Sequence, residues 1–229
     1  MKFENTKVYN FDGAIRGARN PLESWSKSDS TFDIPPQGKT ILGKNDLGLM
    51  QRLIKAAVHD GHESHNKFLR QIMVCVDITA PLFWWKEFDT YKVGTVANST
   101  STMHKLASTP ITIDCFEDKY NEENLVSEFE DGEYKFTFFS LEEEKCIIDW
   151  LESLRLSYLE TKDKKYWKKL ICWLPESWLQ TRTVTMSYEN IRNMYFQRKN
   201  HKLTEWSESF IDWVKSLPYA EELIMYKGE

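Results

Sequence analysis

The spacing of apolar residues along the chain predicts a mixture of helices and strands. Apolar residues recur with the helical period of about 3.6 residues in several stretches. The segments that we expect to be helical on this pattern are 45–60, 80–88, 140–162, 163–174, 188–199 and 203–218. Apolar runs predict strands at 67–78, 134–139 and 179–187, with a weaker signal at 111–116. Because helices outnumber strands and alternate with them irregularly, the predicted class is α+β, a mixed sheet flanked by helices with a long helical C-terminal half.

Cap and turn residues predict where two of these helices begin and end. Asn45 or Asp46 can cap the first helix, and Gly61 follows its last turn. Ser140 and Glu143 have the spacing of a capping box at the start of the longest helix. The apolar residues expected on the buried face of that helix are Ile147, Trp150, Leu151, Leu154, Tyr158 and Leu159.

The N-terminal segment shows little periodicity and many turn residues. These turn residues are Gly13, Gly17, Pro21, Pro35, Pro36, Gly38 and Gly43. We therefore expect a loop-rich arm over residues 1–45 of a single domain that spans residues 1–229. The arm carries Arg16 and Arg19, which are interpreted either as solvated surface or as contacts to a ligand or another subunit.

Composition narrows the classes of function. The net charge of −5 argues against nucleic-acid binding but leaves room for a basic pocket that takes one small phosphorylated ligand. No stretch approaches about eighteen apolar residues, so we expect no membrane partner and a cytoplasmic location. The high content of Trp, Tyr and Phe must be buried in a core, in an interface or against a planar ligand. Four separated cysteines without metal-ligand spacing predict reduced, mostly buried thiols.

The common enzyme signatures do not occur in the sequence. We find no glycine-rich phosphate loop, no G-x-S-x-G elbow and no H-E-x-x-H helix. His59, His62 and His65 lie three residues apart, but Gly61 interrupts the helix there, so no metal site is predicted.

Two polar clusters could bind a ligand. The first is the hydroxyl-rich stretch 88–105, with Tyr91, Lys92, Asn98, Ser101 and His104. The second lies near the C-terminus and contains Asn190, Arg192, Arg198, Lys199, His201 and Lys202. Cations that alternate with Asn and Tyr suit recognition of a phosphate and a base edge, and a solvated face is the alternative.

Short stretches in a fixed order carry a resemblance over most of the chain. GAIRG lies near the N-terminus, HDGHESHNKF contains Gly61, His62 and Ser64, and MVCVDITA precedes PLFWWKEF. WLPESW precedes a strand and then ENIRNMYFQRKNHKLTEW, with matching positions at Leu174, Pro175, Asn190, Arg192 and Arg198. In this order they resemble elements of the flavin-dependent thymidylate synthases, the ThyX family. Stretches such as RNPLESW and RKNHKLTEW also resemble phage and prophage proteins that are described as ThyX-like.

The sequence departs from the family signature, which is Arg-His-Arg followed after seven residues by Ser. Placing Ser101 on that Ser puts Tyr-Lys-Val, at 91–93, where the family has Arg-His-Arg. Asn98 then falls on a position that is often Asn. Lys67 and Phe68 stand where the family has Glu-His, which helps to build the flavin site.

The resemblance implies a set of ligands and site residues. A ThyX enzyme methylates dUMP with FAD, NADPH and methylenetetrahydrofolate, and it is a homotetramer with sites between subunits. The implied catalytic residues are Ser101 and Arg192, and the implied cofactor-binding residues are His62, Ser64, Tyr91, Lys92 and Asn98. The implied nucleotide-binding residues are Arg16, Arg19, Ser101, His104, Asn190, Arg192 and Arg198.

Two functions follow as hypotheses. The first is a divergent FAD-dependent thymidylate synthase or a related pyrimidine-modifying enzyme. The alternative is a catalytically inactive oligomer that binds or sequesters a signalling nucleotide, for instance a cyclic one. If a phage encodes the protein, this would take place in the cytoplasm of the host cell. Both predict a small-molecule nucleotide as partner, and a purely structural oligomer is a third possibility that needs only the tryptophans.

Overall fold

The structure is a computed structural model of the whole chain. It describes residues 1–32, 40–61, 64–117, 129–130, 133–134 and 141–228. His62, the proposed cap residue Ser140 and most of the strand predicted at 134–139 lie outside the described residues.

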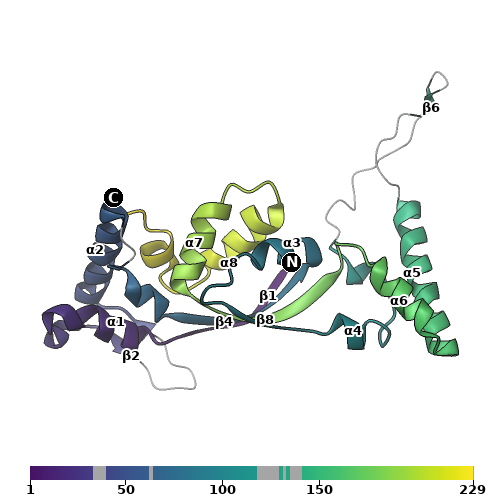
Figure 1. The fold of residues 1–229 in the computed structure, drawn as a ribbon. Coiled ribbons are helices and arrows are strands. Elements are labelled where there is room, and N and C mark those ends of the chain that lie inside the picture. The colour runs from purple at the N-terminus through teal and green to yellow at the C-terminus, as the bar shows by residue number, and fades with distance from the viewer. Residues whose placement is uncertain (33–39, 62–63, 118–128, 131–132, 135–140, 229) are drawn as a thin grey trace. The chain divides into compact units, whose positions relative to one another are not determined.

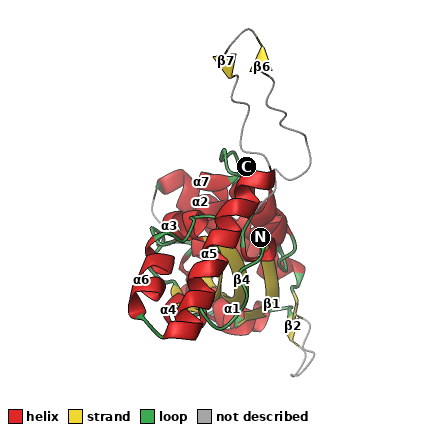
Figure 2. Ribbon diagram, turned by 90° about the vertical axis from the view of Figure 1, so that its right-hand side faces the viewer, coloured by secondary structure: helices red, strands yellow, loops and turns green. Residues whose placement is uncertain are grey.

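Strands and helices alternate irregularly, as the α+β prediction requires. The strands of the described residues are Lys2–Tyr9 (β1), Thr31–Phe32 (β2), Thr40–Ile41 (β3), Met73–Pro81 (β4), Val96–Ser99 (β5), Phe129–Glu130 (β6), Glu133–Tyr134 (β7) and Leu179–Ser187 (β8). Strands β1, β4, β8 and β5 form a sheet in that order, while β2–β3 and β6–β7 are separate antiparallel pairs. The α+β class is confirmed, and Figure 2 shows how far helices predominate over strands.

Helices make up most of the C-terminal half, as predicted. The α-helices are Phe11–Arg19 (α1), Lys44–Asp60 (α2), Leu82–Phe88 (α3), Thr102–Lys105 (α4), Leu141–Thr161 (α5), Lys164–Cys172 (α6), Tyr188–Arg198 (α7) and Ile211–Lys215 (α8). The 3₁₀-helices are Asn20–Leu22 (η1), Trp25–Lys27 (η2), Lys67–Arg70 (η3) and Ile113–Cys115 (η4), and the π-helices are Glu205–Phe210 (η5) and Ala220–Ile224 (η6). No helix among the described residues is long and apolar enough to cross a membrane.

The chain forms two compact units. The first unit consists of Met1–Ile78, Asp89–Asn98 and Arg182–Glu229, and the second of Thr79–Phe88 and Ser99–Thr181. The single domain expected over residues 1–229 stays a prediction.

The core of the first unit surrounds strand β4. Val74, Val76 and Ile78 are fully buried, while the residues between them are half-buried. The strand predicted at 67–78 is correct from Met73 onward, but its first residues form the 3₁₀-helix η3. Phe68 and Leu69 of η3 are both buried.

The second unit contains the helix pair α5 and α6, which lie side by side in Figure 1. Leu151, Leu154 and Leu170 form its core with Leu106 and Ile111. The buried face predicted for α5 is therefore only partly correct. Three residues assigned to it, Ile147, Trp150 and Leu159, are 45%, 37% and 38% exposed. The single short helix α6 covers only a narrow stripe of α5, so these residues remain accessible.

Parts of the arm predicted to be loop-rich are helical. Helix α1 buries Phe11, Ala14 and Ile15, a helical spacing that the glycines of this segment obscured. The cap predicted for α2 is also wrong, because the Asp29 carboxylate accepts hydrogen bonds from the first backbone N–H groups of the helix. Gly61 does end α2 in a left-handed conformation, as expected.

The cysteines are free, but they are not the buried thiols that the sequence suggested. Cys75 and Cys115 are half-buried, and Cys146 and Cys172 are exposed. The exposed pair lies on α5 and at the end of α6, where the packing leaves one face of each helix accessible.

Candidate functional site

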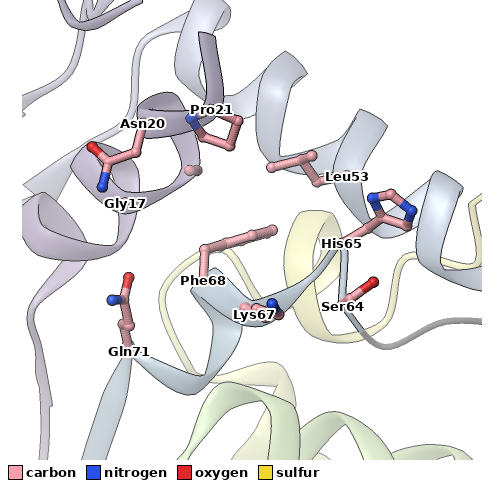
Figure 3. Close-up of a pocket in the computed structure, with 10 residues that line it drawn as sticks. Gly17, Asn20, Pro21, Leu53, Ser64, His65, Lys67, Phe68 and Gln71 are labelled. Atoms are coloured by element: carbon pink, nitrogen blue, oxygen red, sulfur yellow. The ribbon is translucent and has the colours of Figure 1, made fainter. Parts of the chain in front are cut away.

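A pocket of about 320 Å³ lies in the first unit between α1, α2 and η3 (Figure 3). We call it the α1–α2 pocket. Its lining residues are Gly17, Ala18, Asn20, Pro21, Leu53, Ser64, His65, Lys67, Phe68 and Gln71. The stretches GAIRG and HDGHESHNKF, which are far apart in the sequence, thus contribute to one cavity.

Small residues on α1 allow the wall of the pocket to form. A side-chain carbon on Gly17 would lie 2.6 Å from Oε1 of Gln71, so only glycine permits this approach. Asn10, which precedes α1, donates from Nδ2 to the backbone carbonyl of Gln71 over 3.0 Å. Helix α1 and the end of η3 are thereby held together.

The pocket combines groups of different chemistry. Phe68 is almost fully buried and points its ring into the cavity, whereas Ser64, His65 and Lys67 are exposed at its rim. No described carboxylate pairs with the Lys67 ammonium group. The arrangement offers a cation, an imidazole, a hydroxyl and an aromatic face to one small ligand.

Arg19, at the end of α1, forms a buried ion pair with Asp46 of α2. Its guanidinium lies 2.6 Å from the Asp46 carboxylate and donates to the carbonyls of Ser24 and Lys27. Burial alone would raise the pKa of Asp46, but hydrogen bonds from Ser30, Ser28 and Arg19 outweigh it and lower the pKa. Arg19, predicted to bind a nucleotide, is thus bonded to the protein itself.

A second group of predicted residues gathers on helix α7, and we call Tyr91, Asn190, Arg192, Gln197 and Arg198 the α7 cluster. Asn190 completes a capping box with Ser187 at the start of the helix. Its Nδ2 also donates to the carbonyl of Val93 over 2.7 Å. This hydrogen bond connects residues 91–93, where the family has Arg-His-Arg, to the start of α7.

Tyr91 and Arg198 bond to each other within this cluster. The Tyr91 hydroxyl donates to Oε1 of Gln197 over 2.9 Å and accepts from Nε of Arg198 over 2.8 Å. The Arg198 guanidinium also lies 4.9 Å from the ring centre of Trp206. The structure brings these two predicted residues together, and it uses their polar atoms for mutual contacts.

Arg192 is buried and holds the C-terminal segment. It donates from one guanidinium nitrogen to the carbonyls of Leu223, Ile224 and Tyr226. Burial lowers the pKa of the guanidinium, and the ring of Phe196 lies 4.8 Å away. The catalytic and nucleotide-binding roles implied for Arg192 stay predictions, because this geometry shows only a structural role.

The other predicted site residues are exposed or half-buried. Lys92 and Asn98 are exposed in the first unit, and Arg16 is exposed on α1. Ser101 belongs to the second unit, where its Oγ caps the short helix α4 by accepting from the His104 backbone N–H. Ser64 lines the α1–α2 pocket, and the cofactor-binding role implied for it stays a prediction.

The sequence reasoning missed the polar residues Asn20 and Gln71, and it treated Lys67 only as a departure from the family. The lining residues come from α1, η1, α2 and the segment around η3, which are far apart in the sequence, so no local spacing could reveal the pocket. The signal that could have found Asn20 is the compact run RNPLESW, which places a carboxamide directly after α1.

Metal ligation has no support in the described part of the chain. No group of three or more His, Cys, Asp or Glu side chains there could hold an ion. His59 lies in the last turn of α2, and His65 lines the α1–α2 pocket.

Comparison with known proteins shows similarity of fold without clear similarity of sequence. No protein-family model matches the chain, and no curated protein matches it in sequence. Two solved structures of the flavin-dependent thymidylate synthase ThyX from Helicobacter pylori, both with FAD and dUMP, align with a TM-score of 0.65 at 16% identity. The alignments cover 98% of this chain and 98% or 97% of those chains. The chain therefore has the ThyX fold.

Proposed function

We propose that this chain is a nucleotide-binding protein and that its ligand occupies the α1–α2 pocket. The observation that carries the proposal is the pocket itself, in which a cation, an imidazole and a buried aromatic ring surround one cavity. The ThyX fold supports it, because both similar structures are complexes with dUMP.

Different side chains of the pocket would bind the charged part and the planar part of the ligand. Lys67 would pair with the phosphate, since its ammonium group has no described carboxylate partner. Ser64 and His65 stand beside it at the rim and can add hydrogen bonds to phosphate or sugar oxygens. Phe68 would contact the planar base, because it carries the aromatic ring among the lining residues.

The size of the pocket suits a ligand of one nucleotide. Ligand pockets span about 300–1,000 Å³, so 320 Å³ lies at the lower end of the range. A mononucleotide has one base, one sugar and one phosphate, whereas FAD contains two nucleotide-like halves.

The described residues of this chain do not fit FAD as a resident cofactor. The family positions for Arg-His-Arg carry Tyr91, Lys92 and Val93, and the Tyr91 hydroxyl is already bonded to Gln197 and Arg198. The pocket volume of about 320 Å³ lies at the lower end of the range for ligand pockets, which suits one nucleotide better than two.

Replacing Lys67 tests the proposal. Calorimetry with UMP and dUMP should show binding to the wild-type protein and a loss of about tenfold or more in affinity for Lys67→Ala. Lys7→Ala removes the same charge from an exposed position of the first unit outside the pocket, and it should bind as the wild type does. The proposal fails if no mononucleotide binds below millimolar concentration, or if both variants bind equally well.

A divergent flavin-dependent thymidylate synthase is the second candidate function. The observation that favours it is the alignment, over almost the whole chain, with enzymes solved with FAD and dUMP. Such an activity requires groups beyond the described residues of one chain, and a homotetramer could supply them. A flavin absorbance spectrum in the purified protein and tritium release from labelled dUMP would establish it, and a colourless protein that takes up no FAD would exclude it.

Binding without reaction is the simpler form of the proposed function. A phage-encoded oligomer of this kind would sequester a signalling nucleotide in the host cytoplasm. The discriminating measurement is recovery of the nucleotide after incubation with the protein, and its mass should be unchanged if the chain is a binder.

A further inference from the structure

Two carboxamides face the same end of the α1–α2 pocket. Asn20 comes from η1 and Gln71 follows η3, and Figure 3 shows the amide nitrogen of Asn20 on the side towards the oxygen of Gln71. Both residues are exposed. Among the described residues, neither Nδ2 of Asn20 nor the side chain of Gln71 has a hydrogen-bond partner.

The orientation of the Asn20 amide is fixed by Trp25. The indole N–H of Trp25 donates to Oδ1 of Asn20 over 2.9 Å. Since an indole nitrogen can only donate, the acceptor end of the amide must face Trp25, and the donor end lies on the side of Gln71 in Figure 3. Arg16 lies over the Trp25 ring at 5.3 Å and holds that ring in place.

The position of Gln71 is fixed from the other side. Its backbone carbonyl accepts from Asn10, and its Oε1 approaches α1 at the site where Gly17 has no side chain. Residues of α1 and η1 thus line one side of the pocket together with Gln71. A donor from η1 and an acceptor beside η3 are presented together, and neither has a partner among the described residues.

We propose that Asn20 and Gln71 read the hydrogen-bonding edge of a planar heterocycle and so determine the ligand specificity of the pocket. A ring edge with a carbonyl beside an N–H group would accept from Asn20 and donate to Gln71. This inference rests on the proposed function, because Lys67 and Phe68 hold the phosphate and the face of the same ligand.

A structural role alone does not account for the pair. The indole contact uses only the oxygen of Asn20, and the main-chain contact of Gln71 uses only its carbonyl. Either contact could be made without presenting an amide to the cavity. Both side chains are exposed, so water satisfies the remaining donor and acceptor in the free protein, and the edge of a ligand would replace that water.

The same edge chemistry occurs in nucleobases and in flavin rings, and ligands of known composition separate these sources. UMP and FMN both carry a carbonyl beside a ring N–H, whereas ribose 5-phosphate carries neither. In N3-methyl-UMP a methyl group replaces the ring hydrogen. We expect the wild-type protein to bind UMP about tenfold more tightly than ribose 5-phosphate or N3-methyl-UMP. We expect FMN to bind more weakly than UMP, because its three-ring system exceeds this small pocket.

The test compares variants of the two carboxamides by calorimetry. Gln71→Leu and Asn20→Ala should each lose about tenfold in affinity for UMP and retain the affinity for ribose 5-phosphate. Gly17→Ala should behave like Gln71→Leu, because the added carbon displaces the Gln71 amide. The matched control is Leu22→Ala, which changes an 81% exposed residue of the same 3₁₀-helix outside the pocket and should bind as the wild type does.

Trp25→Phe gives a sharper test of the orienting contact. The variant keeps an aromatic ring beneath Arg16 and removes only the N–H donor to Asn20. The Asn20 amide could then turn, so affinity for UMP should fall about threefold while binding of ribose 5-phosphate stays unchanged.

The outcomes separate this inference from the function on which it rests. If Lys67→Ala abolishes UMP binding while Gln71→Leu and Asn20→Ala bind UMP as the wild type does, the edge-reading role is overturned and nucleotide binding stands. If FMN binds more tightly than UMP and shows the same losses, the edge-reading role holds and the heterocycle is a flavin ring. If the wild-type protein binds none of the four ligands, both proposals are overturned.

Discussion

The α1–α2 pocket and the α7 cluster have similar residues but different surroundings. Both contain cations and carboxamides, and both lie in the first compact unit. In the α7 cluster the polar groups of Tyr91, Asn190 and Arg192 are bonded to other parts of the protein. In the pocket, Lys67 and Gln71 have no described side-chain partner.

This difference separates structural from ligand-directed polar residues. A buried polar group that is already hydrogen-bonded stabilises the fold, and diverting it to a ligand would leave its first partner unsatisfied. Residue type therefore does not identify a binding site by itself. Substitutions in the α7 cluster should lower stability, whereas substitutions at the pocket rim should lower affinity.

The largest loss of stability should come from breaking the buried Arg19–Asp46 ion pair. Asp46→Ala leaves the Arg19 guanidinium buried without its carboxylate, and we expect a loss of about 4 kcal/mol in the free energy of unfolding. Urea unfolding followed by circular dichroism measures it. Asp12→Ala, an exposed acidic residue on α1, is the control and should change stability by less than about 0.5 kcal/mol. Equal stability of the two variants would show that the Arg19–Asp46 ion pair does not stabilise the fold.

Arg192 is the next test, and it addresses the α7 cluster directly. Arg192→Ala removes the donor to three C-terminal carbonyls, so the free energy of unfolding should fall by about 3 kcal/mol. Asn193→Ala changes an exposed residue of the same helix and should be nearly neutral. A variant that unfolds like the wild type but no longer binds UMP would instead assign Arg192 to the ligand.

Asn190 should have an intermediate effect. Asn190→Ala removes one half of the capping box and the hydrogen bond to Val93, with an expected loss of about 2 kcal/mol. Chemical unfolding gives the value, and Ser187→Ala should show a loss of the same order because it removes the other half of the box. Unchanged stability together with weaker nucleotide binding would contradict the structural role.

Tyr91 allows a smaller and more specific test. Tyr91→Phe keeps the ring against Trp206 but removes the hydroxyl that bonds to Gln197 and Arg198. We expect a loss of about 1 kcal/mol in thermal or urea unfolding. Tyr9→Phe, at a 48% exposed tyrosine, is the matched control and should have no measurable effect.

The smallest effect on stability should occur at the pocket rim. Lys67→Ala should change the free energy of unfolding by less than about 0.5 kcal/mol, since the residue is exposed and unpaired among described side chains. The same preparation serves for the calorimetric experiment with UMP. A loss of stability comparable to that of Arg192→Ala would remove the contrast between the two regions.

The sequence predicted most elements whose pattern is local. Strand β8, helix α7 and the buried aromatic helix α3 follow from the periodicity of apolar residues within a few residues. Helix α1 was missed, because its glycines are typical of turns. Here they instead allow Asn10 and Gln71 to approach the helix, which is a contact between distant segments.

The candidate site was less accessible to sequence reasoning than the fold. The resemblance pointed to Ser64, which lines the pocket, and to Arg19 and Arg192, which the structure shows bonded to Asp46 and to backbone carbonyls. A guanidinium looks the same in a sequence whether its partner is a carboxylate of the protein or a phosphate of a ligand.

The sequence by itself determined the helical and extended segments, the ThyX-like order of motifs and the residue types available for binding. Only the tertiary structure decided which of those residues are satisfied by the protein and which face a cavity. The physical reason is that periodicity and capping act over a few residues, whereas burial and hydrogen-bond pairing depend on contacts such as Arg19 with Asp46 or Asn190 with Val93.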